Sequence, residues 1–141
     1  NPYAVQEREV EITGDLVKMG GAGGTELLRL DFVADAAGQP PAEDPTSPIL
    51  LLGDSHVLVF HAGGDLHATG AGLPDQLAAL LGRPVDLLGV RGSGATTSRI
   101  SLMRRARAKP EYLAGKQAVI WCFGAREFTE ADMWRLVPLG L

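Results

Sequence analysis

The chain has little of what a cross-linked, metal-bound or membrane-embedded protein needs. It holds one cysteine among 141 residues, which excludes an internal disulfide, and three histidines, all within the short stretch from His56 to His67. The printed sequence contains no apolar run long enough to cross a membrane, and we expect no signal peptide within it. A hydrophobic core must therefore hold the fold. At this length one domain over residues 1–141 buries about two-thirds of its unfolded surface.

A strong excess of one charge is also missing. Lys and Arg number 13 against 17 Asp and Glu, for a net charge of −4. Nucleic acids demand a basic surface, so we expect no nucleic-acid partner. The one basic cluster, from Arg104 to Lys109, has no aromatic residues between its cations and is typical of a solvated helix face. The lone Cys122 lies in the apolar run 117–123, which favours a buried, inert thiol.

The hydrophobic pattern predicts alternating strands and helices in one α/β domain. Strands are expected at 5–12, 26–33, in the apolar run ending at Gly53, at 85–90 and at 117–123. Helices are expected at 14–19, 73–81, from about Thr97 to Ala108 with Thr96 or Thr97 as N-cap, and from near Glu130. The connector 35–48 is expected to be a loop. Right-handed crossovers then predict a mainly parallel central sheet with helices on both faces.

Ser55 follows directly after the most apolar of these strands. The sequence from Ser47 to Phe60 runs through buried-strand residues into Gly53-Asp54-Ser55-His56. Open α/β folds bind their ligands at the carboxyl edge of the sheet, and glycine permits the tight strand-to-helix turn. The alternative is an ordinary Gly-Asp-Ser turn. Because parallel strands end at one edge, we expect Ser55, the Gly92/Gly94 loop and the turn at 124–127 to be neighbours.

A serine nucleophile needs oxyanion donors and a base. The N–H groups of Ser55 and of the Gly92–Gly94 loop could donate to the oxyanion. Arg126 could place a positive charge at this edge, or could pair with Glu127 or Glu130 instead.

Few residues could serve as the base. His56 adjoins the serine, where side chains at a helix start point apart. Asp65 and His67 have the spacing of an Asp/His pair, although His67 could also be a solvated loop residue. A zinc site from His61, Asp65 and His67 is a further alternative, but its spacing fits no usual metal motif. We expect no metal and no cofactor.

Six ordered blocks resemble the SGNH hydrolase superfamily, and within it the alginate O-acetyltransferase-like branch. These blocks are 13–16, 48–55, 71–78, 82–86, 92–95 and 119–127. The resemblance implies a three-layer, flavodoxin-like sandwich and a serine-dependent polysaccharide O-acetyltransferase or acetylesterase. It also implies a periplasmic or other extracytoplasmic bacterial location. The expected partners are a polysaccharide and an acetyl donor, with other secretion or acetylation proteins as further candidates.

The resemblance also implies roles for single residues. Ser55 matches the nucleophile, and Gly92 and Gly94 match a block that helps to form the oxyanion hole. Arg126 matches an arginine of the third block, and Arg99 an arginine after the second block. Asp54 is expected to support the site.

The chain differs from this branch in the position of its histidines relative to the serine. In the branch a catalytic Asp-x-His pair precedes the serine, whereas here the first histidine is His56. We expect the chain to be a carboxyl-terminal piece that lacks this segment. The alternatives are a relative without the pair, or Asp65 and His67 as substitutes. A catalytically inactive glycan-binding or scaffold module of a polysaccharide-secretion assembly is the second function considered. Phosphate or nucleotide binding is the third, and the glycine loops lack the spacing for it.

Overall fold

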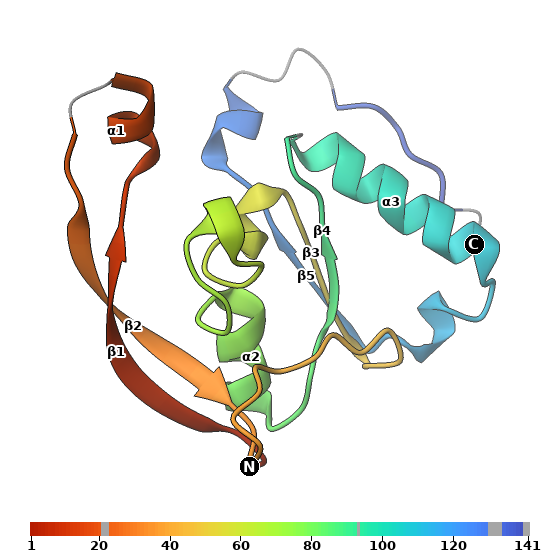
Figure 1. Ribbon diagram of the computed structural model, residues 1–141. Helices are drawn as coiled ribbons and strands as arrows, with labels where there is room; N and C mark the ends of the chain where they lie inside the picture. Colours follow the sequence, from red (N-terminus) through yellow and green to blue (C-terminus); the bar gives the residue numbers. More distant parts are fainter. Residues whose placement is uncertain (21–22, 93, 130–133, 140–141) are drawn as a thin grey trace.

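Two sheets of different kinds organise the chain (Figure 1). The computed structural model describes residues 1–20, 23–92, 94–129 and 134–139. The strands are β1 (Ala4–Ile12), β2 (Glu26–Ala34), β3 (Ile49–Gly53), β4 (Asp86–Gly89) and β5 (Ala118–Cys122). β1 and β2 pair antiparallel as a separate ribbon, while the other three form a parallel sheet in the order β4-β3-β5. The predicted α/β class, with parallel core strands, is confirmed.

The central strand β3 is apolar on both faces because a helix covers each face of the sheet. Leu50 and Leu52 pack with Leu102 of α3 (Ala95–Ala108) on one face. Leu51 packs on the other face with Val57 and with Leu77 of α2 (Leu73–Leu81). Figure 1 shows α2 and α3 on opposite sides of the strands. An alternating pattern suits a half-exposed strand, whereas a continuous apolar run suits this doubly covered position.

The bounds of α2 follow from local signals that the sequence displays. Its first turn is closed by the Asp75 carboxylate, which accepts a hydrogen bond from the Gly72 N–H at 2.9 Å. Its last turn ends at Gly82, whose φ of +66° is left-handed and favours glycine. The predicted helix at 73–81 is confirmed at both ends.

The start of α3 differs from the prediction. The helix begins at Ala95 with Gly94 in the N-cap position, so Thr96 and Thr97 lie inside its first turn and do not cap it. Ala95 is fully buried, and packing of this residue extends the helix toward the loop. Tertiary packing here overrides the capping preference of threonine.

β5 is an edge strand, although the sequence pattern predicted a core strand. It pairs only with β3 in the described sheet, and Val119 and Ile120 are 51% and 37% exposed. The helix expected from Glu130 falls on residues 130–133, which lie outside the described residues, and residues 134–139 are in neither helix nor strand. Within the described part of the chain, no helix is long and apolar enough to cross a bilayer.

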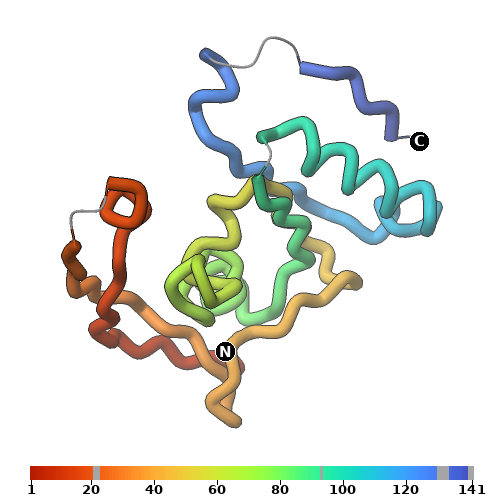
Figure 2. The backbone as a smooth tube through the Cα atoms, turned by 45° about the horizontal axis from the view of Figure 1, so that its top comes forward, coloured from red at the N-terminus to blue at the C-terminus, as the bar shows by residue number. Residues whose placement is uncertain are grey.

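The β1–β2 ribbon stands beside α2 and carries the short helix α1 (Asp15–Gly20) at its far end (Figures 1 and 2). Its base is tied to the body of the molecule by hydrogen bonds from the Val33 N–H to Gly70 O at 2.7 Å and from Asn1 Nδ2 to Ala79 O. The predicted strand at 5–12, the helical turn at 14–19 and the strand at 26–33 are confirmed within one residue at their ends.

Candidate functional site

Three turns meet at the carboxyl edge of the parallel sheet. The turn after β3 is joined to the turn after β4 by the Val90 N–H, which donates to Gly53 O at 3.1 Å. It is joined to the turn after β5 by the Gly124 N–H, which donates to an Asp54 carboxylate oxygen at 3.1 Å. The Glu127 carboxylate lies against Gly94, which links the last two turns. The predicted juxtaposition of these turns is confirmed.

Ser55 opens a short 3-10 helix, η1 (Ser55–Leu58), immediately beyond β3. The residue is half-buried at the sheet edge. Gly53 makes this turn possible because a Cβ there would lie 2.7 Å from the carbonyl oxygen of Cys122 and would collide with Val57. The close approach of β3 to η1 and β5 therefore depends on glycine directly before the Asp-Ser pair.

Asp54 fixes this turn with a buried carboxylate. The residue is 2% exposed, and its Oδ1 accepts hydrogen bonds from the His56 N–H at 2.9 Å and from the His56 ring at 2.7 Å. Its Oδ2 accepts from the Gly124 N–H. Burial alone would raise the pKa of Asp54, but the donors at His56 and Gly124 outweigh it and hold the pKa below its ordinary value. Asp54 therefore holds the turn as a carboxylate anion, and its support of a catalytic site stays a prediction.

His56 is oriented by Asp54. Its Nδ1 faces the carboxylate, and its side chain is 58% exposed. The ring also lies beside the β5 turn, with Cε1 3.5 Å from where a Cβ on Gly124 would stand. The sequence reasoning placed His56 apart from Ser55 and overlooked Asp54 as its partner. The Asp-Ser-His spacing was the available signal, because an N-cap aspartate can also reach a side chain two residues on.

The loop after β4 supplies the glycines expected at the oxyanion hole. Gly92 is exposed, and its φ of +70° is a left-handed backbone conformation that favours glycine. Gly94 precedes α3 in an extended conformation. Ser93 lies outside the described residues. The contribution of these N–H groups to an oxyanion hole stays a prediction.

Arg126 and Glu127 belong to the 3-10 helix η4 (Ala125–Phe128) after β5. Arg126 is exposed and folds back toward Gly124, with its Nε 3.9 Å from that residue's Cβ position. Arg126 and the His56 ring therefore flank the same glycine. Glu127 contacts Gly94 instead of pairing with Arg126, and Glu130 lies outside the described residues.

Arg99 packs within an aromatic cluster that the sequence reasoning missed. Its guanidinium lies 5.7 Å from the Trp121 ring centre and 5.3 Å from that of Trp134. Its NH2 group donates to Thr96 Oγ1 at 3.1 Å. The remaining rings of the cluster are Phe123 and Phe128. Trp121 lies in β5 and Phe123 follows directly after the strand, and their spacing of two in an apolar run was the available signal.

This aromatic cluster reaches the surface beside the β5 turn. Phe128 is 73% and Trp134 40% exposed. Trp134 donates its indole N–H to Glu127 O at 3.1 Å. The buried indole N–H of Trp121 has no hydrogen-bond partner among the residues that the structure describes. Exposed aromatic rings next to a polar edge form an apolar surface that is open to solvent.

Asp65 and His67 do not pair with each other. The Asp65 carboxylate binds Arg91, in the loop after β4. His67 takes a left-handed backbone with φ +78°, and its ring packs on Phe60 at 5.8 Å. The segment 65–67 therefore folds toward the loop that follows β4. Asp65 pairs with Arg91 and His67 packs on Phe60, so the two residues do not form the expected Asp/His pair.

His61 forms the second Asp/His pair of the molecule. Its Nδ1 lies 3.0 Å from the fully buried Asp75, and its Nε2 lies 3.9 Å from Glu43. The hydrogen bond to Asp75 raises the pKa of His61, and the nearby Glu43 adds to this effect against the opposing effect of burial. The pair ties the first turn of α2 to the loop after η1.

The zinc alternative is not supported. His61, Asp65 and His67 each have a different neighbour, and within the described residues no three His, Cys, Asp or Glu side chains are grouped to hold a metal ion.

Cys122 is half-buried at the end of β5. Burial raises the pKa of its thiol, and the negative charge of Asp54 raises it further. Because the thiolate is the reactive form, both effects favour the inert thiol that the sequence predicted.

Comparisons with known proteins assign no family to the chain. It matches no protein-family model and no curated protein.

Proposed function

We propose that the chain is a serine-dependent polysaccharide O-acetyltransferase or acetylesterase domain with Ser55 as its nucleophile. In this proposal the sheet is the core of an SGNH-type, flavodoxin-like sandwich. The partners are a polysaccharide and an acetyl donor, and the protein acts outside the cytoplasm.

The observation that carries this proposal is the setting of Ser55. It stands at the start of η1, half-buried at the carboxyl edge of the sheet, directly after a residue whose carboxylate locks two turns together. Such rigidity matters because acyl transfer needs the attacking oxygen and the oxyanion donors at fixed separation. The N–H of Ser55 and those of Gly92 and Gly94 are the proposed donors. Arg126 is the proposed cation beside the oxyanion or the substrate.

In this proposal the reaction at Ser55 is a two-step acyl transfer. The serine oxygen attacks the acetyl carbonyl, the donor's leaving group departs with a proton, and an acetyl-serine ester remains. A sugar hydroxyl or water then takes the acetyl group and restores the serine. No histidine is hydrogen-bonded to Ser55 among the described residues. Without a positioned base, the oxyanion hole and binding alone supply roughly 10³ to 10⁴ over water.

Active-site labelling tests the proposal. The purified chain is treated with a fluorophosphonate, which reacts with activated serines, and its hydrolysis of p-nitrophenyl acetate is measured. Because no base is positioned on Ser55 among the described residues, we expect slow labelling and slow hydrolysis by the unmodified chain, and we expect Ser55→Ala to abolish the labelling and to reduce hydrolysis to background. Ser101→Ala, at a half-buried serine within α3, is the matched control and should behave as the unmodified chain. Equal labelling of the Ser55→Ala and Ser101→Ala variants would exclude Ser55 as the nucleophile.

A catalytically inactive glycan-binding or scaffold module is the second candidate. The exposed rings of Phe128 and Trp134 beside the edge favour it, because they offer a stacking surface that needs no nucleophile. This candidate predicts that Phe128→Ala weakens binding of an oligosaccharide, measured by calorimetry. It also predicts that Ser55→Ala leaves both binding and polysaccharide acetylation unchanged. The enzymatic proposal predicts that acetylation is lost with Ser55.

A further inference from the structure

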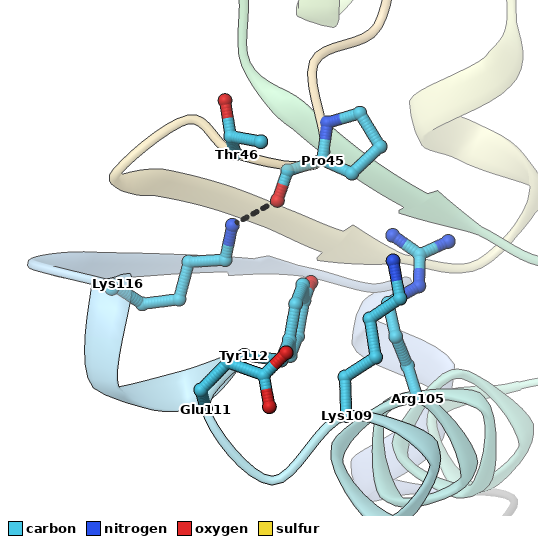
Figure 3. A pocket seen from close by; sticks show the side chains of 8 residues that line it. Pro45, Thr46, Arg105, Lys109, Glu111, Tyr112 and Lys116 are labelled. Atoms are coloured by element: carbon cyan, nitrogen blue, oxygen red, sulfur yellow. Dashed lines mark hydrogen bonds between the residues drawn. The ribbon is translucent and has the colours of Figure 1, made fainter.

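A pocket of about 520 Å³ opens at the amino edge of the parallel sheet, the edge opposite Ser55 (Figure 3). Its walls come from the loop before β3, the end of α3 and the segment that leads into β5. The lining residues include Pro45, Arg105, Lys109, Glu111, Tyr112 and Lys116. Because the pocket lies at the starts of the strands, it is separate from the candidate acyl-transfer site.

A buried carboxylate organises the back of this pocket. Asp86, the first residue of β4, is 1% exposed and accepts hydrogen bonds from Arg105 NH1 at 2.8 Å and from the Tyr112 hydroxyl. Lys116 pairs with the same carboxylate at 2.8 Å, and its ammonium also donates to the carbonyl oxygens of Pro45 and Ser47. The three donors of Lys116 are thereby used, so this lysine is part of the wall.

Two cations of the pocket keep donors for a ligand. Arg105 uses NH1 on Asp86, but its side chain lines the pocket and is one-third exposed, so part of its guanidinium is accessible there. Lys109, the residue that caps α3, is exposed and has no carboxylate partner within the described part of the chain. Figure 3 shows the ends of both side chains on the same side of the pocket. The sequence reasoning assigned this basic cluster to a solvated face, and for Arg105 that assignment is wrong.

The charged side chains in and behind the pocket have a net positive charge. Three cationic side chains, Arg105, Lys109 and Lys116, stand against two carboxylates, Asp86 and Glu111. The Tyr112 ring adds an apolar surface flanked by cations, with Lys116 Nζ 4.5 Å and Arg105 Cζ 5.7 Å from its centre. A pocket of this size suits a small molecule, and an arginine fork beside a lysine suits an oxyanion.

We propose that this pocket binds a small organic anion. The carboxylate or phosphate group of the ligand is held by Arg105 and Lys109, and its apolar body rests against Pro45 and Tyr112. The inference is independent of the proposed acyl transfer, since it uses no residue of the carboxyl edge.

Titration of the full chain with three probes tests this proposal. Benzoate and phenyl phosphate carry the two candidate anionic groups on the same ring, and benzyl alcohol is the uncharged comparison. Amide NMR shifts report the place of binding. We expect either anion, or both, to shift the signals of Thr46 and Gly115 without shifting that of Gly92 at the other edge. The anion that binds more tightly identifies the group that the pocket prefers.

A charge-reversal pair provides the matched control. Lys109→Glu and Arg107→Glu change the net charge equally at the end of one helix, but Arg107 does not line the pocket. We expect Lys109→Glu to weaken anion binding about tenfold or more, and Lys109→Gln to weaken it less. Arg107→Glu should change it by less than about twofold in physiological salt. Equal weakening by both reversals, equal binding of benzyl alcohol, or no shift at Thr46 and Gly115 would overturn the proposal.

Discussion

Replacing Asp54 by asparagine should destabilise the protein by disconnecting two turns of the candidate site. The amide oxygen of the new side chain can still accept the His56 N–H, but its NH₂ group would meet the Gly124 N–H donor to donor. One charge-assisted hydrogen bond is then lost, the partly buried Gly124 N–H is left unpaired, and the bond to the His56 ring is weakened. Since a hydrogen bond to a charged group is worth about 1.5–3 kcal/mol, we expect the free energy of unfolding to fall by about 2–4 kcal/mol.

Urea denaturation followed by tryptophan fluorescence measures this change. Asp31→Asn is the control, because Asp31 is exposed and its carboxylate accepts no hydrogen bond among the described residues. That variant should change the unfolding free energy by no more than about 0.5 kcal/mol. A loss of stability in Asp54→Asn no greater than in Asp31→Asn would refute the assigned role of the carboxylate.

The same comparison has a defined pH dependence. The pKa of Asp54 is lowered by folding, so its stabilising contribution is present above the pKa of an unfolded aspartate, about 3.9. It is lost as the pH falls through the lower pKa of the folded state. The stability gap between the unmodified chain and Asp54→Asn should therefore be constant near neutral pH and shrink in acid. A gap that widens in acid would contradict the lowered pKa.

Three further predictions concern the surroundings of the site. Folding raises the pKa of His61, so its pairing with Asp75 stabilises the folded protein fully below about pH 6.5 and less as the pH rises through the folded-state pKa. The loss of unfolding free energy in His61→Gln, measured by urea denaturation, should therefore be larger at acidic than at alkaline pH. Gly53→Ala should lower the unfolding free energy by about 3 kcal/mol or more, because the carbonyl of Cys122 and the side chain of Val57 cannot both move away from the new Cβ. Gly24→Ala is the control: open space surrounds Gly24, so this change should alter the unfolding free energy little. The thiol of Cys122 should react slowly with iodoacetamide at neutral pH and rapidly in urea, and equal rates would contradict its raised pKa.

The sequence predicted those elements whose signals are local. The apolar run before Gly53 indicated a doubly covered parallel strand, and Gly82 marked the end of α2. Because parallel strands share an edge, the meeting of the Ser55, Gly94 and Gly124 turns followed from topology alone.

The contacts that fix the site could not be predicted in the same way. The bond between Asp54 and Gly124 joins residues 70 positions apart, and the Arg105–Asp86 pair joins residues 19 positions apart. No pattern along the chain specifies which cation turns inward. A single aspartate at the start of the apolar run 85–90 was a usable signal, since a buried carboxylate requires nearby donors. The edge position of β5 was missed because its apolar residues also suit a central strand.

The central claim is that Ser55 accepts an acetyl group, and mass spectrometry of the acylated protein tests it most directly. The purified chain is mixed with p-nitrophenyl acetate, quenched in acid so that an ester survives, and digested for peptide mapping. We expect one hydroxylamine-sensitive acetyl group on Ser55, absent from Ser55→Ala and retained in Ser101→Ala. Acetylation confined to lysines, or unchanged when Ser55 is replaced, would contradict the claim.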